Sequence, residues 1–165
     1  PIDSPRGVDI VQILRSVCES KRCQSPVVQL LDPLPRQAMV LAHRERLERI
    51  IGHVVQNALD ATNEDGKVTA QLSLAGDGRA SLVIADTGCG MSADFLRDRL
   101  SRPFQTTKAS GMGIGVFETR QYLNEIGGDL QFESEVGRGT RATILLPCLS
   151  DGRQDLQDGA SEIHA

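Results

Sequence analysis

The chain has 165 residues, which is enough for one ordinary domain with a buried core. Its formal net charge of -4 argues against a general electrostatic hold on nucleic acid or on an anionic membrane surface. Aromatic residues make up only 3% of the chain, so the core must be aliphatic, and stacking platforms for nucleic acid are not expected. No apolar run approaches the roughly 20 residues of a membrane span, so this part of the protein is not expected to contact a membrane directly.

Hydrophobic periodicity and glycine or proline punctuation predict the elements along the chain. They are a helix over 8–22, strands over 26–33 and 37–42, a helix over 44–62, strands over 66–76 and 78–86, a helix over 115–128, and strands over 127–135 and 139–147. Neighbouring strands with helices between the groups predict an α+β sandwich and not a doubly wound parallel fold. Residues 150–165 are polar and without period, so we expect a disordered tail or linker there.

The helix predicted at 44–62 carries a polar stripe. His53, Asn57 and Asp60 are spaced i, i+4, i+7, so they lie together at the border of the apolar face. Such a stripe can border the core and still look into a cleft. Taken alone, Asn57 is either a surface amide or an oxygen ligand for Mg²⁺, a hard cation that prefers oxygen. Taken alone, His53 fits a partly buried, hydrogen-bonded histidine.

The segment DTGCGM, at residues 86–91, directly follows the apolar run SLVIA and allows two interpretations. An Asp-Thr-Gly after a hydrophobic strand is how aspartic proteases present a catalytic carboxylate, with two such carboxylates sharing a proton. An Asp-x-Gly-x-Gly is also how one class of ATP-binding domains holds adenine. The protease interpretation leaves the polar stripe and the glycine-rich loop that follows unexplained.

Residues 102–116, RPFQTTKASGMGIGV, form a glycine-rich loop directly before a predicted helix. Glycines let backbone N–H groups approach an anion, and the helix N-terminus adds partial positive charge. Lys108 supplies a point charge for phosphate, and alternate glycines give the hinge freedom of a lid. A flexible surface loop is the plainer alternative. The loop is neither a Walker P-loop nor a Rossmann fingerprint, because it lacks G-x-x-x-x-G-K-[ST] and no strand leads directly into its glycines.

Five segments therefore stand in one order: HVVQNALDA, DTGCGM, RPFQTTK, GMGIG and GRGTRATILLP. Their order and spacing resemble the catalytic, ATP-binding domain of bacterial sensor histidine kinases, in the GHKL superfamily shared with gyrase and MutL. The resemblance covers about residues 8–147 and implies the Bergerat fold, a two-layer α/β sandwich whose mixed, mainly antiparallel sheet packs on about three helices. It assigns 1–149 to that domain and 150–165 to a tail. The segments PFQTTK, GMGIG and NALDA resemble the nitrogen-sensor type, and TTKASGMGIGVFETRQYLNEIGG resembles the PEP-CTERM/exosortase-associated kinases called PrsK.

The resemblance implies a role for each matched residue. Asn57 would coordinate Mg²⁺ bridging the ATP phosphates, and Asp86 would accept a hydrogen bond from the adenine amino group. Guanine has an oxygen at that place and would leave the carboxylate unpaired. Asn57, His53 and Lys108 are the candidate catalytic residues. The other implied nucleotide contacts are Gly88, Gly90 and Met91 near the base, Phe104, Thr107 and Lys108 in the lid, Gly111, Met112, Gly113, Ile114 and Gly115 around the triphosphate, and Thr140 in the adenine pocket.

Two positions depart from the family pattern. Four residues before the metal-binding Asn, sensor kinases usually have Asn and hydrolysing relatives a Glu base, whereas this chain has His53, as in the chemotaxis kinase pattern HxxxN. The missing carboxylate favours phosphotransfer over ATP hydrolysis, and His53 could touch a phosphate or polarise the nucleophile. Asp60 stands where many relatives have Lys or Arg. It would repel phosphate, so it is assigned no ligand role.

The implied function is transfer of the γ-phosphoryl group of Mg-ATP to a histidine on an upstream dimerisation domain, with a response regulator as the further partner. The resemblance also implies a homodimeric, cytoplasmic protein, possibly membrane-anchored through an upstream segment. His43, His53 and His164 do not lie in an H-box-like context, so this chain is expected to bind ATP or ADP without phosphorylating itself. The alternatives are a nucleotide-binding regulatory module without transfer activity, an ATP-hydrolysing member of the superfamily, and the aspartic-protease-like domain.

Overall fold

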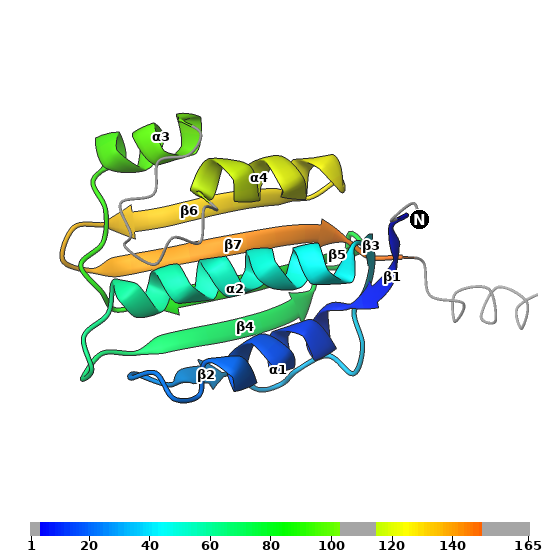
Figure 1. Ribbon diagram of the computed structural model, residues 1–165, viewed down its shortest axis with the longest axis horizontal. Coiled ribbons are helices and arrows are strands. Elements are labelled where there is room, and N and C mark those ends of the chain that lie inside the picture. Colours follow the sequence, from blue (N-terminus) through cyan, green and yellow to red (C-terminus); the bar gives the residue numbers. More distant parts are fainter. Residues whose placement is uncertain (1–3, 103–114, 150–165) are drawn as a thin grey trace, which may run out of the picture.

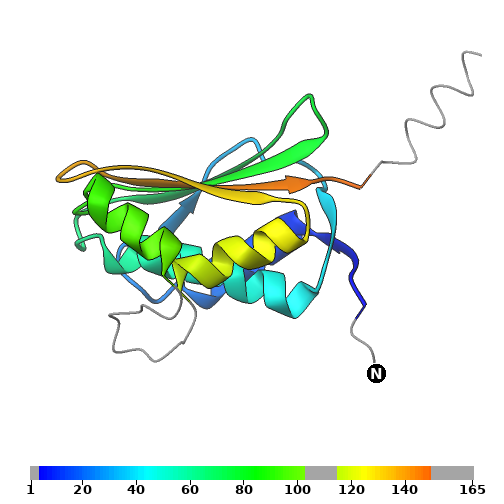
Figure 2. The ribbon, with the colours of Figure 1, turned by 90° about the horizontal axis from the view of Figure 1, so that it is seen from above.

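The computed structural model describes residues 4–102 and 115–149, which form a sheet covered by helices on one face (Figures 1 and 2). The elements are β1 (Arg6–Asp9), α1 (Ile10–Ser20), β2 (Val28–Leu30), β3 (Met39–Ala42), α2 (Arg44–Asp60), β4 (Val68–Leu74), β5 (Arg79–Asp86), α3 (Ala93–Ser101), α4 (Val116–Glu125), β6 (Asp129–Glu135) and β7 (Gly139–Pro147). Within this described part of the chain, no helix is long and apolar enough to cross a membrane.

The main sheet has the strand order β2-β4-β5-β7-β6. Only β2 and β4 pair in parallel, and the other neighbours are antiparallel. The predicted two-layer fold with a mixed, mainly antiparallel sheet is therefore confirmed. The register of β5 and β7 sets Asp86 directly opposite Thr140. These two residues are 54 positions apart in the chain and meet at one end of the central strands. The family resemblance assigns both of them to the adenine pocket.

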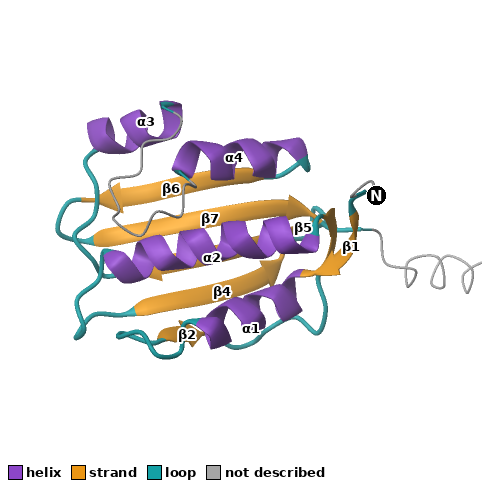
Figure 3. Cartoon of the chain, in the orientation of Figure 1, coloured by secondary structure: helices purple, strands orange, loops and turns teal. Residues whose placement is uncertain are grey.

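The core between the layers is aliphatic, as the composition requires. Leu14 of α1, Ile51 of α2 and Leu123 of α4 are fully buried against the sheet residues Leu82 and Ile144. Burying one such side chain contributes about 1.5–3 kcal/mol relative to leaving it exposed. Figure 3 shows α2 lying over the middle of the sheet, where its apolar residues are buried in the core.

Two short elements were not predicted. Strand β1 pairs with β3 in a separate two-stranded sheet, so Val8 belongs to a strand and not to the first helix. The helix begins at Ile10 because the Asp9 carboxylate caps it, accepting the backbone N–H groups of Val11 and Ala38 at 3.0 Å each. Helix α3 is the second, and it raises the count of helices in the described residues to four.

The turn between β6 and β7 is pressed against the loop that follows β5. Gly90, at φ +70°, and Gly139, at φ +91°, both adopt the left-handed conformation that favours glycine. A side chain at Gly90 would overlap the backbone of Glu135, and one at Gly139 would overlap the backbone of Asp86. The Gly137 N–H also donates to the Cys89 carbonyl at 2.7 Å. These close approaches fix the segment 86–91 against the end of the sheet.

Candidate nucleotide site

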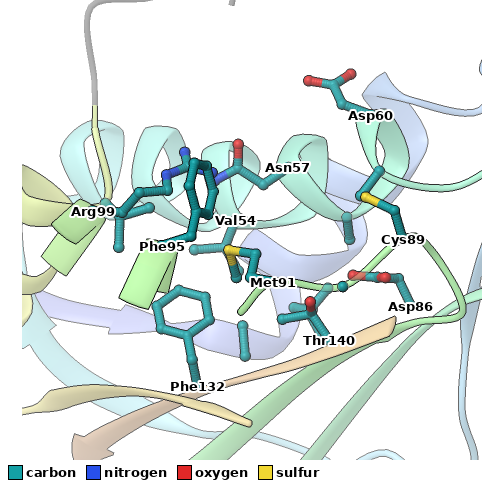
Figure 4. A pocket seen from close by; sticks show the side chains of 16 residues that line it. Val54, Asn57, Asp60, Asp86, Cys89, Met91, Phe95, Arg99, Phe132 and Thr140 are labelled. Atoms are coloured by element: carbon teal, nitrogen blue, oxygen red, sulfur yellow. The ribbon is translucent and has the colours of Figure 1, made fainter. Parts of the chain in front are cut away.

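A pocket of about 220 Å³ lies between α2, α3, the loop after β5 and the end of the sheet (Figure 4). Asn57 lines it from α2, and Asp86 lines it from the end of β5. Figure 4 shows these two side chains on different sides of the pocket. Its apolar walls include Ile84 and Phe132, which suit the faces of a flat ring. The structure therefore brings together the two residues on which the sequence prediction depends.

Asp86 is half-buried at its side of the pocket. Burial raises the pKa of its carboxyl above the ordinary value of 3.8, and hydrogen bonds from the backbone of Gly88 and Thr140 offset only part of that rise. The Gly88 N–H donates to Oδ1 at 2.9 Å. A carboxylate has about four acceptor positions, so Asp86 retains acceptor capacity for an amino group in the pocket.

Asn57 is half-buried and lies beside His53 of the preceding turn. Its Nδ2 is 3.3 Å from the His53 Nε2, while the His53 ring itself is buried and does not line the pocket. This contact orients the Asn57 amide, whose oxygen is an acceptor of the hard type that a cation prefers. His53 thus fits a positioning role, and its direct contact with a phosphate stays a prediction. Asp60 also lines the pocket, and it accepts a hydrogen bond from Gln56 at 2.8 Å.

Ser134 of β6 is part of the site although the sequence did not suggest it. Its Oγ accepts the Met91 N–H at 2.7 Å, lies 2.7 Å from the Thr140 hydroxyl, and can donate to the Gly139 carbonyl at 3.2 Å. Met91 and Thr140 both line the pocket. One hydroxyl of β6 therefore links the loop after β5 to the first residues of β7.

Replacing Ser134 with alanine is expected to weaken ATP binding by about 5-fold, the scale of one lost hydrogen bond of roughly 1 kcal/mol. The Met91 N–H would lose its acceptor, and the Thr140 hydroxyl would lose the neighbour that orients it. Isothermal titration calorimetry measures the change. Ser73→Ala, at an exposed position of β4, is the matched control and should bind as the parent does. Equal affinity of the parent and Ser134→Ala would show that this hydroxyl does not support the site.

Helix α3 adds Phe95 and Arg99 to the pocket lining. The Ser92 Oγ caps the helix by accepting the Phe95 N–H at 3.2 Å. A serine followed by an acidic first turn is the sequence sign of a helix start, and it was present in SADFLRDRL. Arg99 is half-buried, and this burial lowers the pKa of its guanidinium.

The remaining predicted contacts divide into two groups. Gly90 and Met91 line the pocket, Gly88 binds Asp86, and the buried Gly115 precedes α4, where its N–H donates to the Glu118 carboxylate at 2.9 Å. The residues outside the described part of the chain are Phe104, Thr107, Lys108, Gly111, Met112, Gly113 and Ile114. Among the described residues, no three His, Cys, Asp or Glu side chains gather to hold a metal ion. The Asn57 amide is the described side chain that we expect to contact Mg²⁺, an ion usually held by few protein ligands together with phosphate oxygens.

Residues 42–150 match the family described as histidine kinase-, DNA gyrase B- and HSP90-like ATPases. The sensor histidine kinase ZraS of Klebsiella oxytoca is 31% identical over 125 residues, covering 76% of this chain and 26% of ZraS. The histidine protein kinase DivJ of Caulobacter vibrioides is 35% identical over 153 residues, covering 87% of this chain and 25% of DivJ. The chain thus spans about a quarter of the length of these relatives.

The fold agrees with solved kinase structures. The full-length structure of ShkA in complex with AMPPNP is 26% identical with a TM-score of 0.68, covering 92% of this chain and 32% of ShkA. The chain therefore belongs to the family of histidine kinase-, DNA gyrase B- and HSP90-like ATPases, and within it corresponds to the ATP-binding catalytic domain of sensor histidine kinases. The family match includes DTGCGM, so the aspartic-protease interpretation of that segment is wrong.

Proposed function

We propose that this chain binds Mg-ATP and transfers its γ-phosphoryl group to a histidine on a dimerisation domain outside residues 1–165. The observation that carries the proposal is the placement of Asp86 and Asn57 on two sides of one pocket. Asp86 can accept a hydrogen bond from the adenine amino group, and the Asn57 amide offers a hard oxygen for Mg²⁺. The kinase names of ZraS and DivJ, and the AMPPNP in the ShkA structure, support the same function.

The chemistry asks these residues mainly for positioning and charge neutralisation, because phosphoryl transfer needs little covalent help from the protein. Position 53 carries a histidine where hydrolysing relatives carry a glutamate base, and the ring is buried against the Asn57 amide. Because the His53 ring is buried, it is better placed to orient the Asn57 amide than to activate a water molecule. This favours phosphoryl transfer over ATP hydrolysis.

The finer assignments are part of the same proposal. The residues TTKASGMGIGVFETRQYLNEIGG favour a nitrogen-sensor kinase of the PrsK type. We place Phe104, Thr107 and Lys108 in a lid over the phosphates, with Lys108 as a phosphate contact. The proposed partners are the protein's own dimerisation helices, in a cytoplasmic homodimer, and a response regulator that receives the phosphoryl group.

Labelled ATP tests the function directly. The chain mixed with its own dimerisation helices should give an acid-labile, base-stable label on the helices, which identifies phosphohistidine. The chain alone should bind ATP and remain unlabelled at His43, His53 and His164. Binding without any transfer to the helices would favour the nucleotide-binding regulatory module instead. Label on the isolated chain would contradict the proposed need for an acceptor outside it.

A further inference from the structure

Arg99 carries the only positive charge among the described residues that line the pocket. Two lining residues, Asp60 and Asp86, carry negative charge. A nucleotide brings several more negative charges at its phosphates, and these must be met by cations or N–H donors. Asp60 makes that need greater, because it adds negative charge at the rim. Of the described residues that line the pocket, Arg99 is therefore the one that can place a cation beside the phosphates.

The surroundings of Arg99 differ from those of the neighbouring arginines in and just after α3. Arg97 lies 3.6 Å from the Asp94 carboxylate, and Arg102, just after the helix, lies 2.8 Å from Asp98. Within residues 4–102 and 115–149, no carboxylate pairs with Arg99, whose guanidinium instead lies 5.7 Å from the centre of the Phe95 ring. Arg99 is also half-buried, and this loss of water lowers its pKa. A desolvated cation without a counter-ion is costly, so an anion entering the pocket would be stabilised there.

The place of Arg99 in the pocket indicates which part of a nucleotide would supply that anion. Figure 4 shows Arg99 and Asn57 on the side of the pocket away from Asp86. If Asp86 holds the adenine amino group, the phosphates extend toward the Asn57 side. A guanidinium there can give two parallel hydrogen bonds to phosphate oxygens, which a flexible ammonium cannot do in the same geometry.

We propose that Arg99 is a nucleotide-binding residue that contacts a phosphate oxygen of ATP or ADP from α3. This inference rests on the proposed function, because it takes Asp86 as the adenine contact. Phe95 would hold the guanidinium in place from one turn earlier on the helix. Many relatives have a Lys or Arg at position 60 of α2, where this chain has Asp60. Arg99 would supply the positive charge from α3 instead.

The test compares ligands with and without phosphate on matched variants. Arg99→Met keeps most of the apolar stem and removes the charge, while Arg99→Lys keeps the charge and loses the planar fork. Arg97→Met removes the same charge from the same helix outside the pocket, so it serves as the control. Calorimetry gives the affinities for ATP and ADP, and an NMR shift titration gives the affinity for adenosine.

Arg99→Met is expected to bind ATP and ADP about 10- to 100-fold more weakly, the scale of charge-assisted hydrogen bonds, and adenosine as tightly as the parent. Arg99→Lys should lie between, and Arg97→Met should match the parent. Equal losses for adenosine and ATP would show a packing role, and an unchanged ATP affinity would also overturn the inference. If Arg99→Met does not fold, Arg99→Gln also removes the charge and is measured in its place, with the same expected result. A parent chain that binds no nucleotide would refute the proposed function itself.

Discussion

Replacing Asn57 with alanine is expected to remove the Mg²⁺ dependence of nucleotide binding and to slow phosphoryl transfer by about 10²- to 10³-fold, the usual cost of one lost transition-state contact. The amide oxygen is the only protein ligand that we assign to the ion. The contact of Nδ2 with His53 Nε2 at 3.3 Å orients the Asn57 amide, and Asn57 lines the pocket. Calorimetric titration of ATP with and without Mg²⁺ measures the first effect. Labelled transfer to the dimerisation helices measures the second.

Two further variants make this result specific. Asn57→Asp keeps a hard oxygen at the same position, so it should retain part of the Mg²⁺ dependence that alanine loses. Asn124→Ala, at an exposed position of α4, removes an amide from a helix surface and should change neither measurement. If Asn57→Ala kept the full Mg²⁺ dependence of the parent, the metal would have to be held elsewhere. The proposed division of the pocket would then be wrong.

The elements with strong hydrophobic periodicity were predictable from the sequence. Helix α2 and strands β5 and β7 were found within about two residues of their observed bounds, because each buries a regular face in the core. Helix α3 has no buried residue, so the pattern that marks a core-facing helix is missing from it. Its cap at Ser92 was the only local sign, and a single cap is a weak one. Strand β1 was missed because four residues are too few to show alternation.

The site shows the same division between local and long-range information. Asn57 and Asp86 could be predicted because each sits in a segment with a recognisable order of residues. Thr140 was assigned to the pocket of Asp86 only through the family resemblance, because their pairing depends on the strand register, which no spacing in the sequence reveals. Ser134 and Arg99 were missed for this reason. The contacts of Ser134 reach Met91, 43 residues away, and Arg99 enters the pocket only through the placement of α3.

Replacing Asp86 with asparagine is expected to weaken ATP binding by about 1–3 kcal/mol, or roughly 5- to 150-fold, because a mismatched amide replaces an acceptor in a partly desolvated place. The asparagine NH₂ group would face the adenine amino group, and both are donors. The same NH₂ group can donate to the guanine oxygen, so the preference for ATP over GTP should shrink. Calorimetry with ATP and GTP on the parent and the variant measures both changes. A variant that binds ATP as tightly as the parent would rule out Asp86 as the adenine contact.

The raised pKa of Asp86 adds a pH dependence with opposite signs for binding and for stability. Because burial raises the folded-state pKa above 3.8, ionisation of Asp86 opposes folding. Its stabilising contribution is complete below 3.8 and is lost as the pH rises through the folded-state value, so the parent should lose stability relative to Asp86→Asn over that window. ATP affinity should change the other way, because the adenine amino group needs the ionised carboxylate, and the advantage of the parent over Asp86→Asn should grow with pH. Denaturant unfolding and calorimetry at matched pH values measure the two trends, and parallel trends would contradict the assignment of Asp86.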